Sequence, residues 1–113
     1  MDMPQGMELP ELRENAAKAT AFLRGMANEC RLLILCRLAE SECSVTQLEE
    51  VLQLSQSALS QHLALLRRLG LVKQRREARL HYYSLASEEA KIIMGTLYNK
   101  YCSIDIASTN GTK

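Results

Sequence analysis

SQSALSQHLALLRRLGLV, residues 55–72, is the stretch that decides the fold. Ser55 is a residue type that caps helix N-termini, because its hydroxyl accepts a backbone N–H that lacks a partner in the first turn. Gly70 is a residue type that ends helices. Between them, leucines recur at helical spacing, so the stretch predicts an amphipathic helix. The leucines are Leu59, Leu63, Leu66 and Leu69, and the opposite face holds Gln56, Ser57, Ser60, Gln61 and Ala64.

The uncharged face of this predicted helix suits the edges of DNA bases. Glutamine can pair with adenine, serine can pair with more than one base type, and alanine can contact the thymine methyl group. Arg67 and Arg68 follow at the end of the helix, where phosphates would pass. An ordinary amphipathic surface helix would show a similar pattern, so the neighbouring segments must decide between the two interpretations.

A second helical pattern, VTQLEEVLQL at residues 45–54, lies directly before this helix. Leu48, Val51 and Leu52 are its apolar positions, and only the junction of Leu54 and Ser55 separates the two patterns. Helices joined this tightly must turn sharply, as they do in a helix-turn-helix. In that motif the second helix enters the major groove of DNA.

A β-hairpin is predicted after the two helices, over residues 71–85, LVKQRREARLHYYSL. Apolar and polar residues alternate there, with Glu77 and Ala78 near the turn. Cations crowd its arms and tip, so it would form a basic wing. The prediction is a mostly α-helical winged helix-turn-helix with a β-hairpin wing. The predicted DNA-contacting residues are Ser55, Gln56, Ser57, Ser60, Gln61, Arg67, Arg68, Lys73, Arg75, Arg76 and Arg79.

The length and composition fit a single domain over residues 1–113, with residues 1–9 and 107–113 expected to be flexible. The formal net charge is only +1, but many acidic residues precede residue 51 and basic residues dominate residues 67–79. Charge placed in this way is the electrostatic footprint of nucleic-acid binding. No apolar run is long enough for a signal peptide or a membrane span, so we expect a cytoplasmic protein with no membrane partner.

The remaining segments predict three further helices. Residues 28–39 are apolar over most of the helix circumference, which is typical of a core helix. Residues 10–25 and 88–104 each carry one apolar stripe, and each stripe could pack on the chain's own core or on a partner. The first stripe is Leu12, Ala16, Ala19, Leu23 and Met26, and the second is Ile92 or Ile93, Leu97, Tyr101 and Ile104.

The segments ANECRLLILCRLAE, SVTQLEEVLQLSQSALSQHLALLRRLGLV and the basic hairpin ending in YYSL resemble the ArsR family of bacterial winged-helix repressors. The resemblance covers nearly the whole chain. It implies a transcriptional repressor of the bacterial cytoplasm and nucleoid, which binds a palindromic operator as a homodimer formed by the first and last helices. Two recognition helices would then lie about 34 Å apart, one turn of DNA. The implied dimer contacts are Leu12, Ala16, Ala19, Leu23, Ile93, Leu97 and Tyr101.

Two cysteines narrow the resemblance to the persulfide-sensing group of that family, which includes BigR, SqrR and HlyU. Cys36 lies in LLILC and Cys102 in a YC near the end of the last helix. From its position alone, Cys36 fits a small buried hydrophobe better than a sensing thiol. The resemblance implies a dithiol switch, in which persulfide or polysulfide joins Cys36 and Cys102 by a disulfide or polysulfide bridge and operator affinity falls. Cys30 and Cys43 depart from the family pattern and are expected to be incidental, although an exposed Cys43 would compete for oxidants.

Other functions remain open on the sequence. The cysteines could sense peroxide in general, or they could be inert in a constitutive anti-silencing DNA-binding protein. Metal sensing is less favoured, because soft metals need converging thiolates or imidazoles and the chain has neither a C-x-C motif nor paired histidines. His62 and His81 are isolated. An enzyme or sulfur carrier is disfavoured by the lack of a nucleophile–base pair or a phosphate-binding loop, and we expect no cofactor or metal.

Overall fold

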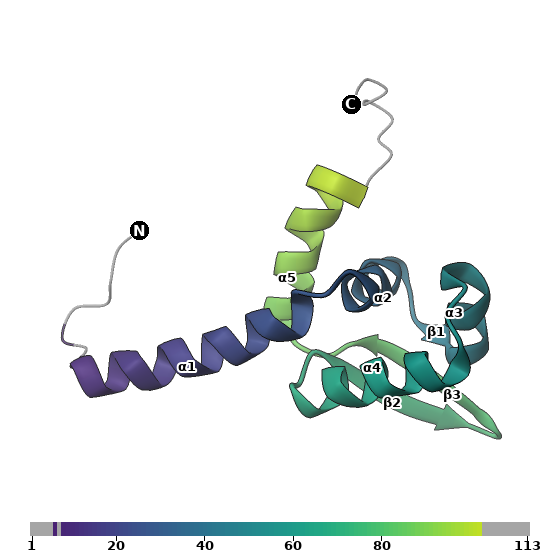
Figure 1. Ribbon diagram of the computed structural model, residues 1–113, viewed down its shortest axis with the longest axis horizontal. Helices are drawn as coiled ribbons and strands as arrows, with labels where there is room; N and C mark the ends of the chain where they lie inside the picture. The colour runs from purple at the N-terminus through teal and green to yellow at the C-terminus, as the bar shows by residue number, and fades with distance from the viewer. Residues whose placement is uncertain (1–5, 7, 103–113) are drawn as a thin grey trace.

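The computed structural model describes residue 6 and residues 8–102, so most of the two segments expected to be flexible lies outside the described residues. Six helical segments and three strands make up the described chain (Figure 1). In chain order they are α1 (Leu9–Met26), α2 (Glu29–Glu40), β1 (Cys43–Ser44), α3 (Val45–Leu52), α4 (Gln56–Arg68), β2 (Val72–Glu77), β3 (Leu80–Leu85), α5 (Glu88–Leu97) and the π-helical η1 (Tyr98–Cys102).

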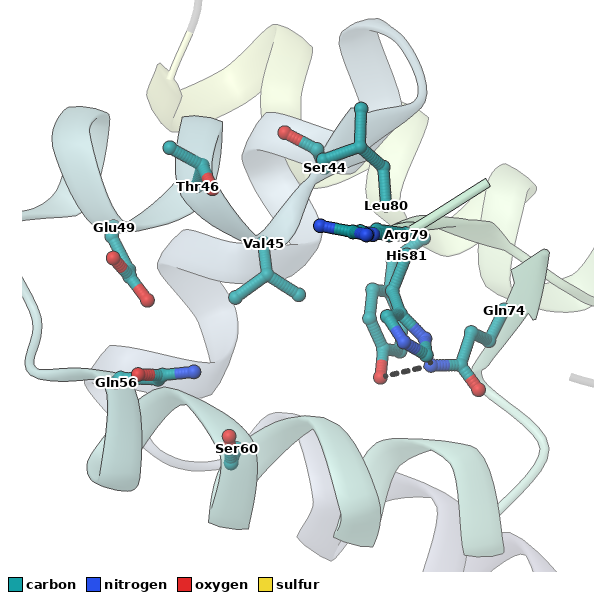
Figure 2. Close-up of a pocket in the computed structure, with 11 residues that line it drawn as sticks. Ser44, Val45, Thr46, Glu49, Gln56, Ser60, Gln74, Arg79, Leu80 and His81 are labelled. Atoms are coloured by element: carbon teal, nitrogen blue, oxygen red, sulfur yellow. Dashed lines mark hydrogen bonds between the residues drawn. The ribbon is translucent and has the colours of Figure 1, made fainter. Parts of the chain in front are cut away.

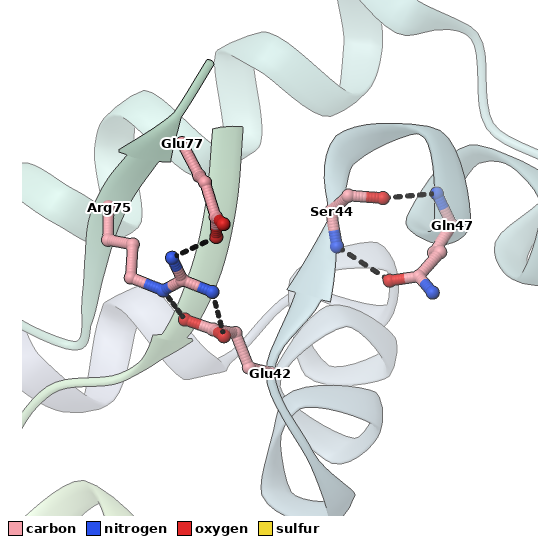
Figure 3. Close-up of polar contacts among 5 residues, drawn as sticks. All are labelled: Glu42, Ser44, Gln47, Arg75 and Glu77. Atoms are coloured by element: carbon pink, nitrogen blue, oxygen red, sulfur yellow. Dashed lines mark hydrogen bonds and ion pairs between the residues drawn. The ribbon is translucent and has the colours of Figure 1, made fainter. Parts of the chain in front are cut away.

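The predicted helix-turn-helix is present as α3 and α4, and side-chain caps set where each helix begins. Ser44 and Gln47 form a capping box, in which the Gln47 N–H donates to Ser44 Oγ at 3.1 Å and the Ser44 N–H donates to Gln47 Oε1 at 2.8 Å (Figure 3). Ser55 caps α4, as predicted, by accepting the Ala58 N–H at 3.2 Å. The turn between them passes through Gln53, whose φ of 56° lies in the left-handed region.

The wing is an antiparallel sheet with strand order β1-β3-β2. The predicted hairpin is present, and Glu77 pairs with Leu80 next to the two-residue turn. Strand β1 was not predicted, because two residues are too few to show an alternating pattern. It exists through its pairing with β3, where Cys43 lies opposite Tyr83 and Ser44 opposite Tyr82.

Helix α2 is the centre of the molecule, as its uniformly apolar sequence predicted. It contacts α1, α3, α4, α5, η1 and β3. Ile34 and Leu35 are fully buried and share one core with the leucines of α4. Burial of this kind contributes about 1.5–3 kcal/mol per large aliphatic side chain. Other fully buried members of the core are Leu48, Leu59, Leu63, Leu66, Leu71 and Met94.

Helix α1 extends away from this body, and only its last turn is buried in it (Figure 1). Gly25 allows the close approach, because a Cβ atom there would lie 2.6 Å from Leu69 Cδ1 and 2.8 Å from Leu71 Cδ1. Before this turn Phe22 packs against the core, and most of the remaining side chains of α1 are exposed.

Two predicted helix ends differ from the structure, whereas α4 ends at Arg68 and Gly70 turns the chain after its C-cap with a φ of 78°, as predicted. Helix α3 ends at Leu52 rather than Leu54. The last helix was predicted to run to Ile104 as one α-helix. Its α-helical part ends at Leu97 and continues as η1 to Cys102, and Ile104 lies outside the described residues.

The core assignment predicts a large stability loss for Leu66→Ala, because Leu66 is fully buried on α4. The free energy of unfolding should fall by about 2–5 kcal/mol, the cost of lost burial plus a cavity. Leu80→Ala is the matched control, because Leu80 is 47% exposed. Urea unfolding at one protein concentration measures both, and equal losses would contradict the assignment.

Candidate nucleic-acid interface and cysteine site

Helix α4 presents its short polar residues to the outside, while its leucines are buried. Ser57, Gln61 and Ala64 lie at the centre of the exposed face, because they recur every three or four residues. Arg67 and Arg68 are exposed in the last turn, where they line a shallow hollow together with Ala64. The helix therefore has an uncharged face of small and amide side chains that ends in two cations.

A polar hollow of about 340 Å³ separates the first half of α4 from the wing (Figure 2). Gln56 and Ser60 line it from α4, and Arg79 and His81 line it from the wing. Its floor on the wing is a hydrogen-bonded group in which the Gln74 amide nitrogen lies 2.7 Å from His81 Nδ1 and donates to Tyr83 Oη at 3.0 Å. The recognition helix and the wing thus face one groove. The other residues along it are Ser44, Val45, Thr46, Glu49 and Leu80.

The predicted cations of the wing lie on two different faces of the sheet, because side chains alternate along a strand. Arg76 shares a face with Gln74, which borders the groove, and Arg79 lies in the turn and lines the groove. Arg75 and Lys73 share the opposite face. Arg76 and Arg79 are both exposed.

The Arg75 guanidinium is held by two carboxylates (Figure 3). It donates to both oxygens of Glu42 at 2.9 Å and to Glu77 Oε1 at 2.8 Å, and its Cζ atom lies 4.6 Å from the centre of the Tyr82 ring. The hydrogen bonds from Arg75 lower the pKa of Glu42 against an opposing effect of burial, and the charge of Lys73 adds to the lowering. The same contacts raise the pKa of Arg75.

The two cysteines of the predicted switch lie on helices that touch. Cys36 is half-buried on α2 and packs against the core, and Cys102 is the last residue of η1, which contacts α2. Tyr98 Oη donates to Glu40 Oε2 at 2.8 Å, joining the two elements one turn from each cysteine. The position of the Cys102 thiol lies outside the described side chains, so the sulfur-to-sulfur approach remains a prediction.

The other two cysteines are shielded from solvent to different degrees. Cys43 is 1% exposed, and its thiol donates to the Ser41 carbonyl oxygen at 3.6 Å. Burial raises the pKa of this thiol, so little of the reactive thiolate forms. The condition for Cys43 to compete for oxidants, an exposed thiol, is therefore not met. Cys30 is half-buried in the first turn of α2.

A mostly apolar hollow of about 450 Å³ lies where α1 meets the start of α5. Ala19, Phe22 and Ile93 line it. The stripe predicted on α1 is largely uncovered, and its Leu23 is 55% exposed. In the stripe predicted on the last helix, Tyr101 of η1 is 75% exposed. The predicted dimer residues Leu12, Ile93 and Leu97 are partly buried, and Ala16 and Ala19 are exposed.

Residues 28–74 match the family described as "Bacterial regulatory protein, arsR family". The chain is also 53% identical over 96 residues to "Transcriptional activator HlyU" of Vibrio cholerae, which covers 85% of this chain and 89% of that relative. This chain belongs to the ArsR family. It is 38% identical to the "Biofilm growth-associated repressor" of Agrobacterium fabrum, over 84% of this chain and 81% of the relative. The structure described as reduced HlyU from Vibrio cholerae matches with a TM-score of 0.80 and 53% identity, covering 84% of this chain and 100% of that one.

Membership of the ArsR family agrees with the winged helix-turn-helix that the sequence predicted. The family's members matched here are transcriptional regulators with a DNA-binding fold, not enzymes. This ArsR chain is accordingly a transcriptional regulator. Within residues 8–102, no helix is both long and apolar enough to cross a bilayer.

Sequence reasoning missed three residues that organise the site of this ArsR chain. Glu42 binds Arg75 across 33 positions, and Tyr98 binds Glu40 across 58. Gln74 joins two residues of the next strand. Cross-strand alternation was a usable signal for Gln74, because His81 and Tyr83 fall on the same face of a hairpin. The sequence held no signal for the other two pairs.

The lowered pKa of Glu42 predicts a pH-dependent contribution to stability. A carboxylate with a lowered pKa stabilises the fold above its ordinary pKa, and this contribution is lost as the pH falls through the lowered value. Glu42→Gln should therefore unfold more easily than wild type at neutral pH, and the difference should shrink toward about pH 3.

Thermal unfolding between about pH 3 and pH 7 measures this difference. Glu50→Gln is the control, because Glu50 is exposed on α3 and forms no ion pair in the described chain. A Glu42→Gln difference that is independent of pH would argue against the ion pair with Arg75.

Proposed function

We propose that this ArsR-family chain binds a palindromic operator as a homodimer and that a cysteine switch controls its affinity. The observation that carries the DNA-binding part is the geometry of α4. Its uncharged face of short side chains is exposed beside a basic wing, and the two border one groove. A helix of this kind fits the major groove, and a neighbouring hairpin fits the flanking backbone.

Base reading and phosphate binding fall to different residues in this proposal. Ser57 and Gln61 read bases from the centre of the α4 face, and Gln56 and Ser60 reach bases from its edge on the groove. Ser55 serves the interface through the cap that begins the helix. The phosphates are bound by cations, since contacts to the backbone position a protein without specifying sequence. These cations are Arg67, Arg68, Lys73, Arg76 and Arg79.

The proposed homodimer uses α1 and α5. The apolar stripe of α1 is largely exposed before its last turn, where Leu23 is 55% exposed, and an exposed stripe of this kind is typical of an interface. A two-fold axis between the subunits would set two α4 helices one DNA turn apart, which accounts for a palindromic operator. The chain would act in the bacterial cytoplasm, on the DNA of the nucleoid.

The proposed effector is a persulfide or polysulfide. The thiolate of Cys36 or Cys102 attacks the outer sulfur of a low-molecular-weight persulfide, becomes a cysteine persulfide and releases the donor thiol. The second thiolate then attacks the inner sulfur of this persulfide, the Sγ atom of the modified cysteine, so that a disulfide forms and the outer sulfur leaves as hydrogen sulfide. If both cysteines carry persulfide, their condensation leaves a trisulfide and also releases hydrogen sulfide.

The contact between α2 and η1 supports a switch at this place, because a bridge there would tie the core helix to the helix of the proposed dimer interface. One structure of a relative that is 53% identical is described as reduced, so its description assigns that protein a redox state. Operator affinity falls only if the bridged form fits DNA worse than the dithiol form.

Two alternatives remain open beside persulfide sensing. Peroxide could form the same disulfide through a sulfenic acid, with release of water. The chain could also act as an anti-silencer with inert cysteines, since one relative is named an activator and another a repressor. Metal sensing is less favoured on the spacing of the cysteines.

Gln61→Ala should reduce discrimination between operator and random DNA by about 1–3 kcal/mol, because one base contact is lost. Arg76→Ala should weaken both complexes equally and reduce the salt dependence of binding. Fluorescence anisotropy on both duplexes at several salt concentrations measures these effects. Equal losses on both duplexes for Gln61→Ala would remove this residue from the base-reading set.

Persulfide should either add sulfur to Cys36 and Cys102 or form a bridge between them. Operator affinity should then fall at least about fivefold. Intact mass, peptide mapping and operator binding on the same samples measure this. Cys36→Ser and Cys102→Ser should abolish the loss of affinity, and Cys43→Ser, at a buried position, is the matched control. An unchanged affinity in modified wild type would contradict the switch, and an equal response to peroxide would favour general redox sensing.

A further inference from the structure

We propose that Arg75 and Glu42 act as a brace that sets the position of the wing, and that Arg75 does not bind a DNA phosphate. The inference deepens the proposed function, because it assigns one predicted DNA-contacting cation a different role in DNA binding. Arg75 is then a positioning residue, since it acts on DNA through the placement of other side chains.

The geometry of Arg75 is that of a committed ion pair. Its planar fork binds both oxygens of Glu42 at 2.9 Å, and its remaining terminal nitrogen binds Glu77 at 2.8 Å. The guanidinium also lies over the Tyr82 ring. A bidentate Arg–carboxylate pair is directional, which a single point charge is not.

The local charge argues against a phosphate at this position. One guanidinium and two carboxylates give the group a net charge of −1, which the nearby Lys73 offsets, so the group offers no net positive charge. A phosphate bound to Arg75 would have to displace Glu42 and remain beside Glu77. Arg76, the next residue of β2, lies on the groove side of the sheet. In the part of the chain that the structure describes, no ion pair involves Arg76.

The brace joins two segments of the wing, and their places in the sheet show that it would fix β2 relative to β1. Arg75 belongs to β2, and Glu42 directly precedes β1, which lies on the other side of β3. The side chain therefore crosses the middle strand, over Tyr82, and joins the two edges of the sheet (Figure 3). Strand β1 itself contributes only two register pairs, and the ion pair adds a side-chain connection between the two edges of the sheet.

The brace also connects the wing to the helix that carries Cys36. Helix α2 ends at Glu40, two residues before Glu42. A shift of α2 would move Glu42, and the rigid fork of Arg75 would carry the shift into β2. The brace thus predicts that its loss weakens both operator binding and the response of operator binding to persulfide.

The test measures operator affinity against salt concentration for Arg75→Gln, Arg75→Lys, Glu42→Gln and the double variant Glu42→Gln/Arg75→Gln. The brace predicts an affinity loss of about three- to tenfold for each single variant and no further loss in the double variant. The salt dependence should not change. Lysine should fail to rescue, because it lacks the fork. Arg76→Gln is the control that should reduce the salt slope by about one phosphate contact.

Three results would overturn the brace. Arg75→Gln could reduce the salt slope, Arg75→Lys could bind like wild type, or Glu42→Gln could bind more tightly because it releases Arg75 for a phosphate. Amide hydrogen exchange without DNA gives an independent readout. Exchange over β2 should rise equally in Arg75→Gln and Glu42→Gln and stay unchanged over α4, and wild-type exchange over β2 in both variants would also overturn the proposal.

These measurements separate the brace from the proposed function. A wild-type chain that does not distinguish operator from random DNA would refute specific DNA binding, whereas hydrogen exchange would still report on the brace. Specific binding with a phosphate-like Arg75 would refute the brace alone. The persulfide response of the two single variants, compared with wild type, tests the connection to α2.

Discussion

The burial of α2 between α4, the sheet and α5 is the constraint on which the rest of the structure depends. Ile34 and Leu35 are fully buried in the same core as Leu59, Leu63 and Leu66. Because the inner face of α4 is fixed by these contacts, its outer face is fixed as well, and a rotation of α4 would expose leucines. The position of the side chains proposed to read bases therefore follows from the hydrophobic effect, with no direct interaction between the polar residues and the core.

The same helix connects the parts of the molecule that regulation would have to join. Its middle carries Cys36, its last turn accepts the hydrogen bond from Tyr98 in η1, and the residues after it lead to Glu42 and the wing. A covalent tie between α2 and η1 would act on an element that contacts the recognition helix, the sheet and the last helix. The effect of such a tie would not have to pass through a long series of residues, because the single helix α2 contacts the recognition helix, the sheet and the last helix.

The sequence predicted those features that depend on local patterns. The leucine spacing and the Ser55 cap located α4, and alternation located the hairpin of the wing. Strand β1 could not be predicted, because its two residues form a strand only through pairing with β3. The π-helical geometry of η1 could not be predicted either, because it does not change the spacing of apolar residues. The partner of Arg75 also could not be predicted, since a basic residue in a wing suggests a phosphate and Glu42 is 33 positions away. The burial of Cys43 depended on the same unpredicted pairing of β1 with β3.

Hydroxyl-radical footprinting on a duplex selected from a random library is the most direct test of the central claim, that α4 of two subunits reads adjacent major grooves. The account predicts two protected half-sites related by two-fold symmetry, with centres about 10 base pairs apart, and loss of both after Gln61→Ala at the same protein concentration. Protection of a single half-site, or no selected sequence at all, would contradict it.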